Sequence, residues 1–192
     1  DSGTMRLSLV AVHIKESTRA VPLGPAMLAS ALKKHLGSAV KTSIVNLYLK
    51  QSVAECLARI AADRPQYVGL SVYMWNRDMM LDIAAGLKRL NPAPVVFAGG
   101  PEAAADCDNI MKCGCIDFII KGEGEDLLVS TFAGVLAGRN AAESAATAEA
   151  SSAPDLAMLP SPYLDGTLDP ARYPGLLWEL SRGCIFKCDF CY

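Results

Sequence analysis

The chain has 192 residues and a formal net charge of −2, with 52% hydrophobic and 20% charged residues. This near-neutral balance gives no electrostatic sign of a nucleic-acid partner, and the apolar fraction argues against intrinsic disorder. No apolar run approaches the ~20 residues that a membrane-spanning helix needs, and no secretory signal is evident. We therefore expect a cytoplasmic chain with no membrane segment, made of one domain and an additional segment. Residues 1–4 precede Met5 and are interpreted as a remnant of cloning.

Short apolar runs alternate with amphipathic stretches from Met5 to Gly138. The apolar runs predict strands over residues 6–13, 41–49, 66–73, 94–98 and 116–120. The amphipathic stretches predict helices over residues 22–36, 52–62, 76–90, 102–112 and 125–136. Asn76 is expected to cap the third helix at its N-terminus, and Gly37 and Gly138 are expected to end the first and the fifth.

Strands that alternate with helices predict βαβ units and a parallel sheet with helices on both faces. Right-handed crossovers favour a doubly wound, flavodoxin-like or Rossmann-like α/β fold whose five strands follow the order 2-1-3-4-5. In such sheets ligands bind beyond the carboxyl ends of the strands, near the point where the strand order reverses. The loops at these strand ends are therefore the place to look for a site.

The character of the sequence changes after Gly138, and residues 139–175 are interpreted as a linker. Residues 140–154 contain no large apolar side chain, so we expect them outside the packed core, as a linker or a marginal solvated helix. The apolar run at residues 176–180 predicts the first strand of a second domain, which residues 176–192 begin.

Four loops at the carboxyl ends of the strands carry the residue types of a ligand site. Glycines follow the fourth and fifth strands and allow close approach to the backbone, aromatic and polar side chains follow the third, and the loop after the first is long enough to cover a bulky planar ligand. The candidate ligand-binding residues are Ser17, Thr18, Arg19, Val21, Ser71, Val72, Tyr73, Met74, Trp75, Asn76, Gly99, Gly100, Pro101, Glu102, Gly122, Glu123 and Gly124. The simpler interpretations are that the glycines only permit turns, that Tyr73 and Trp75 belong to the core, and that the first loop is an exposed connection.

The sequence lacks the two common phosphate-binding patterns. No GxGxxG follows the first predicted strand and no GxxxxGK[ST] occurs, which disfavours a nicotinamide or flavin enzyme. The helix after the fifth strand offers free N–H groups, but Glu123 and Glu125 at its start disfavour a phosphate there. A neutral ligand with hydroxyl or amide groups fits this edge better.

Three of the seven cysteines, Cys184, Cys188 and Cys191, form C-x3-C-x2-C at the C-terminal end. Three thiolates at this spacing are able to converge on one metal centre. A 4Fe-4S cluster normally takes four cysteines, so three would leave one iron open to another ligand. Zinc with a fourth ligand from elsewhere is the alternative. A disulfide is disfavoured because the composition points to a reducing compartment.

This cysteine pattern, with Phe190 before the third cysteine and residues 180–183 before the first, resembles the cluster loop of radical S-adenosylmethionine enzymes. In that family three cysteines hold a 4Fe-4S cluster, and its fourth iron binds S-adenosylmethionine, whose reductive cleavage yields a 5′-deoxyadenosyl radical. The resemblance implies that Cys184, Cys188 and Cys191 hold such a cluster and that S-adenosylmethionine is a second cofactor.

The residues before this loop resemble the N-terminal cobalamin-binding domain of the cobalamin-dependent subclass. The matching segments are LSVYMWN at 70–76, VFAGGPE at 96–102, DFIIKGEGE at 117–125 and LPSPY at 159–163. The resemblance implies that residues 5–138 bind cobalamin through the candidate residues above. It also implies a parent enzyme, most commonly a methyltransferase, whose catalytic barrel starts at residues 176–192 and binds an unknown substrate outside this chain. The chain by itself would bind cobalamin and catalyse nothing.

One departure concerns the cobalt ligand. Cobalamin-dependent mutases and methionine synthase carry DxHxxG, whose histidine is the lower cobalt ligand, but Ala11 and Glu16 replace its Asp and Gly around His13. We expect non-histidine side chains or backbone near the first or third strand at the lower face of cobalt, and a structural role for His13. A different class of function is also open: a flavodoxin-like regulatory or binding module with an appended zinc or redox element, which would bind no corrinoid.

The other four cysteines are interpreted as small buried apolar residues: Cys56, Cys107, Cys113 and Cys115. The last three also resemble, by spacing, an auxiliary cluster of radical methylthiotransferases. However, Cys113 and Cys115 precede the fifth strand, at the edge opposite the predicted ligand.

Overall fold

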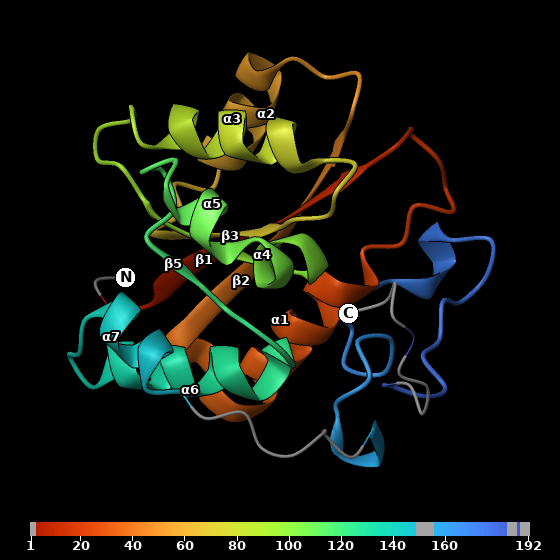
Figure 1. Ribbon diagram of the computed structural model, residues 1–192. Coiled ribbons are helices and arrows are strands. Elements are labelled where there is room, and N and C mark those ends of the chain that lie inside the picture. The colour runs from red at the N-terminus through yellow and green to blue at the C-terminus, as the bar shows by residue number, and fades with distance from the viewer. Residues whose placement is uncertain (1–2, 149–155, 184–187, 189–192) are drawn as a thin grey trace.

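A computed structural model describes residues 3–148, 156–183 and 188 of the chain (Figure 1). Its centre is a five-stranded parallel sheet with the order β2-β1-β3-β4-β5. The strands are β1 (Met5–His13), β2 (Val40–Tyr48), β3 (Tyr67–Ser71), β4 (Val95–Gly99) and β5 (Phe118–Ile119). The predicted fold class and strand order are confirmed.

Helices cover both faces of the sheet (Figure 1). The α-helices are α1 (Leu23–Leu36), α2 (Val53–Ala61), α3 (Arg77–Leu87), α4 (Pro101–Ala105), α5 (Cys107–Met111), α6 (Gly124–Leu136) and α7 (Ala141–Ala146). Short 3₁₀ helices span Gly37–Ala39, Leu156–Met158 and Pro170–Arg172. Helices α2 to α5 contribute to the core on one face, and α1, α6 and α7 to the core on the other. No helix in the described part of the chain is both long and apolar enough to span a membrane.

Strand β1 explains why the sheet is buried on both sides. Leu7 and Leu9 pack with α1 and α6, whereas Val10 and Val12 pack in the cluster of α2 and α3. Successive side chains of a strand point to opposite faces, so a nearly continuous apolar run supplies both cores. Strand β1 therefore lies between the two helix layers, with apolar side chains packed against both.

The predicted helix over residues 102–112 is two helices. Asp106 stands between α4 and α5 with φ −120° and ψ 40°, outside the helical region. Its carboxylate accepts a hydrogen bond from Asn109 Nδ2 at 2.7 Å and pairs with Arg77 Nη2 at 2.6 Å. A short polar side chain with such local partners competes with continuous helix geometry.

The prediction that residues 140–154 lie outside the core is wrong for α7. Asn140 caps this helix by accepting a hydrogen bond from the Ala142 N–H at 2.8 Å, and Ala141 and Ser144 are buried. A Cβ atom added at Gly134 on α6 would lie 2.6 Å from Ser144 Oγ, so the two helices approach closely. Small residues here make a tight helix contact possible, although none of them is large and apolar. Residues 149–155 lie outside the described residues.

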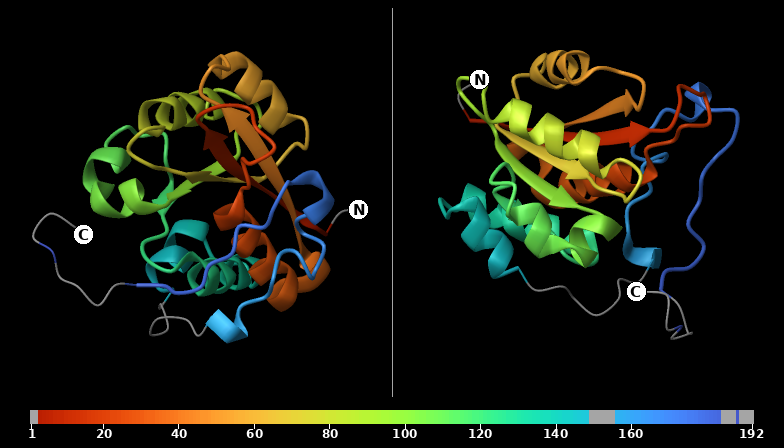
Figure 2. Two further views of the ribbon diagram at one scale, coloured as in Figure 1. Left: turned by 90° about the vertical axis from the view of Figure 1, so that its right-hand side faces the viewer. Right: turned by 45° about the horizontal axis from the view of Figure 1, so that its top comes forward.

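Residues 156–183 lie on the side toward which the strands point (Figure 2). Lys34 on α1 donates a hydrogen bond to the Met158 carbonyl at 2.8 Å, and the Tyr163 hydroxyl exchanges two 3.1 Å hydrogen bonds with the Leu177 backbone. The expected strand at residues 176–180 does not form: this part of the chain has no regular secondary structure. It makes no strand pairing with the five-stranded sheet, and an isolated extended segment has no ladder to stabilise it.

Candidate functional site

A cavity of about 400 Å³ opens at the carboxyl edge of the sheet. Its lining comes from β3, β4, α1, the start of α6 and the C-terminal segment. The candidate residues that line it are Ser71, Tyr73, Gly99, Gly100, Pro101, Gly122, Glu123 and Gly124. The structure therefore brings together residues from three of the four predicted loops.

Two positions beside the cavity, Gly69 and Gly100, have no room for a side chain. A Cβ atom added at Gly69 on β3 would lie 2.5 Å from the Phe97 ring, so only glycine leaves room for this ring at the cavity. Gly100 has φ +100°, and a Cβ there would lie 2.7 Å from the Val72 carbonyl oxygen. A side chain at either position would clash, and at Gly100 it would also be strained.

The other candidate residues do not line the cavity: Ser17, Thr18, Arg19, Val21, Val72, Met74, Trp75, Asn76 and Glu102. Val72 is fully buried in the core. In the first loop, Arg19 N–H donates to Ser17 Oγ at 3.1 Å, which is a local turn contact. The carboxylate of Glu102 pairs with Arg77 at 2.8 Å, and this ion pair contributes to a raised pKa of Arg77 after the larger effect of hydrogen bonding to Asp106.

Asn76 holds the loop between β3 and α3. It is 1% exposed, and its Oδ1 accepts a hydrogen bond from the Tyr73 N–H at 2.8 Å while its Nδ2 donates to the Ser71 carbonyl at 3.1 Å. Asn76 stands at the predicted N-cap position of α3, but its side chain makes no hydrogen bond to the start of the helix. The amide is used instead to close the loop on itself.

This loop presents three large side chains to solvent. Tyr73, Met74 and Trp75 are 40%, 82% and 44% exposed, so the alternative that the two aromatic residues belong to the core is excluded. The Tyr73 and Trp75 rings stack with centroids 5.8 Å apart and an interplanar angle of 19°. Together they form an apolar platform beside the cavity, of which Tyr73 is also a lining residue.

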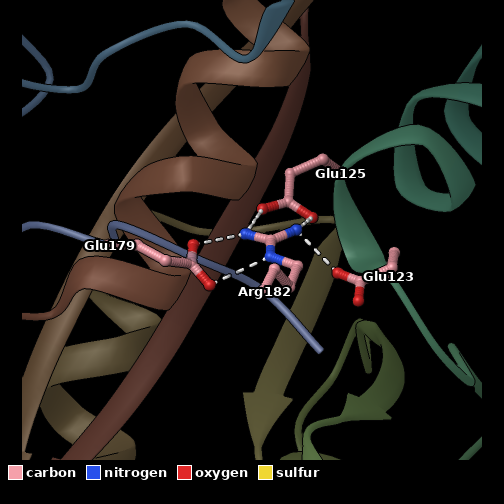
Figure 3. Close-up of polar contacts among 4 residues, drawn as sticks. All are labelled: Glu123, Glu125, Glu179 and Arg182. Atoms are coloured by element: carbon pink, nitrogen blue, oxygen red, sulfur yellow. Dashed lines mark hydrogen bonds and ion pairs between the residues drawn. The ribbon is translucent and has the colours of Figure 1, made fainter. Parts of the chain in front are cut away.

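Arg182 lies at the cavity between three carboxylates (Figure 3). Its guanidinium bonds Glu123 at 2.6 Å, Glu125 at 2.9 and 3.0 Å, and Glu179 at 2.6 and 3.0 Å. These hydrogen bonds raise the pKa of Arg182 further above its usual value and lower the pKa of Glu179. We call these four residues the Arg182 cluster.

Arg182, Glu125 and Glu179 also lie at the cavity, but the sequence did not assign them to the ligand site. Arg182 and Glu125 are 57 residues apart, and no local pattern links residues at that separation. Sequence reasoning also missed part of the apolar lining, namely Leu9, Leu28, Gly69, Phe97, Ile120 and Leu128. A signal did exist for Gly69: a glycine inside an apolar strand often marks a close approach of another group.

The histidine and cysteine predictions have different outcomes. His13 Nε2 hydrogen-bonds Asn46 Oδ1 at 2.9 Å, in keeping with a structural role. Cys56 and Cys115 are buried as expected, but Cys113 is exposed and forms a disulfide with Cys115, so its prediction as a buried apolar residue is wrong. Cys107 is half-buried.

The predicted cluster loop is only partly visible. Cys184 and Cys191 lie outside the described residues, and Cys188 is exposed. Across residues 3–148, 156–183 and 188, no group of three or more histidine, cysteine, aspartate or glutamate side chains is arranged so that it could hold a metal ion. The ligand set of a cluster therefore stays a prediction.

Comparison with known families decides the class of this domain. The model described as "B12 binding domain" matches residues 10–131, which is more than half of the chain. This chain belongs to the B12-binding domain family. The matched range contains the second half of β1, all of β2 to β5 and every residue that lines the cavity except Leu9, Glu179 and Arg182.

Curated relatives support the recognised resemblance to cobalamin-dependent radical S-adenosylmethionine enzymes. The cobalamin-dependent radical SAM methyltransferase TokK of Streptomyces tokunonensis is 33% identical over 148 residues, which are 66% of this chain and 22% of TokK. The 2-(S-pantetheinyl)-carbapenam-3-carboxylate methyltransferase of Streptantibioticus cattleyicolor is 32% identical over 167 residues, covering 76% of this chain and 24% of that enzyme. The chain thus spans about a quarter of the length of these relatives.

A solved structure shares the fold. The cobalamin-dependent S-adenosylmethionine radical enzyme OxsB, with aqua-cobalamin and S-adenosylmethionine bound, superposes with a TM-score of 0.56 at 16% identity. The match covers 70% of this chain and 19% of OxsB. The match with OxsB shows the fold, and the identity with TokK shows that this B12-binding domain is related to cobalamin-dependent radical SAM methyltransferases.

Proposed function

We propose that the domain binds cobalamin at the carboxyl edge of its sheet, in the cavity between β3, β4, α1 and α6. The observation that carries this proposal is the position of the cavity: it lies at the strand ends of a B12-binding domain and is lined by eight of the residues predicted from sequence.

The chemistry of the cavity fits cobalamin. Cobalamin joins a large corrin ring with neutral amide side chains to a nucleotide tail that ends in a planar base. Leu28 and Phe97 offer apolar contact to such a base, while Ser71 and the glycine backbone offer hydrogen bonds to amides. The carboxylates of Glu123 and Glu125 are bound by Arg182, whose positive charge offsets part of their negative charge.

The platform of Tyr73, Met74 and Trp75 is proposed to face the corrin ring. Its exposed apolar surface adjoins the cavity, and Asn76 fixes its backbone. His13 already hydrogen-bonds Asn46, so we propose that the lower face of cobalt meets non-histidine groups near β1 or β3. When bound, cobalamin supplies a cobalt centre able to accept and transfer a methyl group.

The parent enzyme is proposed to be a radical S-adenosylmethionine methyltransferase. The support is the C-x3-C-x2-C pattern of Cys184, Cys188 and Cys191 together with the two curated methyltransferase relatives. These cysteines are proposed to hold the 4Fe-4S cluster that binds S-adenosylmethionine, and the substrate is proposed to bind outside the B12-binding domain.

The cobalamin proposal is tested by loading the purified chain with hydroxocobalamin, desalting it and recording its visible spectrum. We expect the unmodified chain to retain the corrinoid. Gly124→Leu should lose most of it, because a Cβ there lies 2.9 Å from the Leu28 methyl at the cavity wall. Gly175→Leu is the matched control, since nothing lies within 4 Å of its added Cβ.

Retention by Gly124→Leu equal to that of the control would contradict this cavity as the site. Failure of every folded protein to retain corrinoid would contradict the proposed function and favour a binding module of another kind. Circular dichroism of each variant establishes that the comparison is made between folded proteins.

A further inference from the structure

All the N–H groups of the Arg182 guanidinium donate hydrogen bonds to glutamate side chains at the cavity. Its Nε and Nη2 donate to the two oxygens of Glu179, Nη1 and Nη2 donate to the two oxygens of Glu125, and Nη1 also donates to Glu123 (Figure 3). A guanidinium has five N–H donors, and all five are engaged. Lysine has three donors and no planar fork, so it cannot reproduce this arrangement.

The partners of Arg182 belong to two distant parts of the chain. Glu123 and Glu125 stand at the start of α6, at the carboxyl edge of the sheet. Arg182 and Glu179 belong to residues 176–183, which we call the closing segment. Both of these residues also line the cavity. The cluster therefore fastens the closing segment across the cavity and onto α6.

Burial gives this contact its strength. The side chains of Arg182 and Glu125 are 15% and 7% exposed, unlike an ordinary surface ion pair. Truncating one member of a hydrogen-bonded, desolvated charge pair leaves the other charge unpaired and chiefly accelerates dissociation. Without the guanidinium, three carboxylates would face one another at the cavity and would repel the closing segment.

We propose that the Arg182 cluster holds the closing segment shut over the cavity and thereby controls how fast a bound ligand leaves. Arg182 acts here as a positioning residue, through the segment that carries it. For cobalamin as that ligand, the inference rests on the proposed function. The closure itself does not, because every contact in it is made within the chain.

Closure is measured without cobalamin by limited trypsin digestion of the full chain. Trypsin cleaves after arginine, so Arg172, whose side chain is 79% exposed, is an internal reference for Arg182. We expect cleavage after Arg182 to be slower than after Arg172 by about tenfold or more, because proteolysis follows the population of the opened state. Equal rates in the unmodified chain would overturn the proposed closure.

The variant Glu125→Gln removes one negative charge and one of the two Glu125 oxygens that accept hydrogen bonds from Arg182. Arg182 itself remains as a trypsin cleavage site. Cleavage after Arg182 should rise severalfold, with cleavage after Arg172 unchanged. Glu143→Gln is the matched control: it makes the same change on an exposed residue of α7, and it should alter neither rate. No difference between Glu125→Gln and Glu143→Gln would contradict the role of the cluster.

Control of release is measured on the chain loaded with radiolabelled cyanocobalamin and chased with an excess of the unlabelled compound. We expect Arg182→Gln to raise the release rate about tenfold and to change the association rate less. Arg182→Lys should restore only part of the retention. An unchanged release rate in Arg182→Gln would overturn control of release, whereas failure of all proteins to bind cobalamin would contradict the proposed function and leave the trypsin result to decide on closure.

Discussion

The sheet domain and the C-terminal segment are held in place by different physical means. Residues 5–148 bury two continuous apolar clusters on either side of β1 to β5. Only Pro162 and Leu168 are buried in residues 156–183, and this segment depends on polar contacts such as those of Arg182 and Tyr163. The sheet domain is therefore stabilised by its own apolar core, whereas residues 156–183 are held in place mainly by a few hydrogen bonds and ion pairs.

The largest effect that separates the two regions is expected at Phe132 on α6. This ring is fully buried and packs edge-on against Tyr67 and Phe97, with centroids 5.1 and 6.0 Å away. Phe132→Ala should lower the free energy of unfolding by about 3–5 kcal/mol, through lost burial and the cavity left behind. Urea denaturation followed by circular dichroism measures it, and a loss below about 1 kcal/mol would contradict this packing.

A smaller effect is expected on the pKa of Glu179 in the closing segment. Hydrogen bonding to Arg182 lowers this pKa, with burial acting in the opposite direction. A carboxyl group with a lowered folded pKa stabilises the closed form at pH values above its unfolded pKa, and this contribution is lost as the pH falls through the folded pKa. NMR titration should therefore give a higher pKa for Glu179 in Arg182→Gln than in the unmodified chain.

The groups that face Glu179 in this titration are Arg182 and, across it, Glu123 and Glu125. Protonation of Glu179 at acidic pH removes one of the charges that bind the guanidinium. An identical Glu179 pKa in the two proteins would show that the ion pair is not formed in solution.

The smallest effect is expected at Trp178, which completes the comparison with Phe132. This side chain is 80% exposed although it belongs to an apolar stretch. Trp178→Ala should change the free energy of unfolding by less than about 0.5 kcal/mol, as surface substitutions usually do. The same urea experiment measures it, and a large loss would mean that the segment packs as part of the domain core.

The same contrast explains what could be predicted from the sequence. The apolar pattern of β1 predicts a strand buried on both faces, and the alternation of strands and helices then limits the topology to few choices. Gly99, Gly100 and Gly122 follow different strands, and they line one cavity because the carboxyl ends of parallel strands meet at one edge of the sheet. Periodicity and topology are properties that short stretches of sequence carry.

Contacts that the periodicity of the sequence does not encode account for the differences. Asn76 stands at the N-cap position of α3 as predicted, but its amide bonds the preceding loop and not the helix. Helix α7 has no large apolar residue, and its Ala141 and Ser144 are buried because Gly134 on α6 lets the two helices approach closely. Arg182 and Glu125 meet across 57 residues, and no local pattern indicates such a contact.

The central claim, that cobalamin binds at the carboxyl edge, is tested most directly by a crystal structure of the chain grown with hydroxocobalamin. We predict corrinoid density in the cavity between Phe97 and Leu28, with the ring beside the platform of Tyr73, Met74 and Trp75. Density at the opposite edge of the sheet, in the cavity lined by Arg6 and Arg64, would contradict the account.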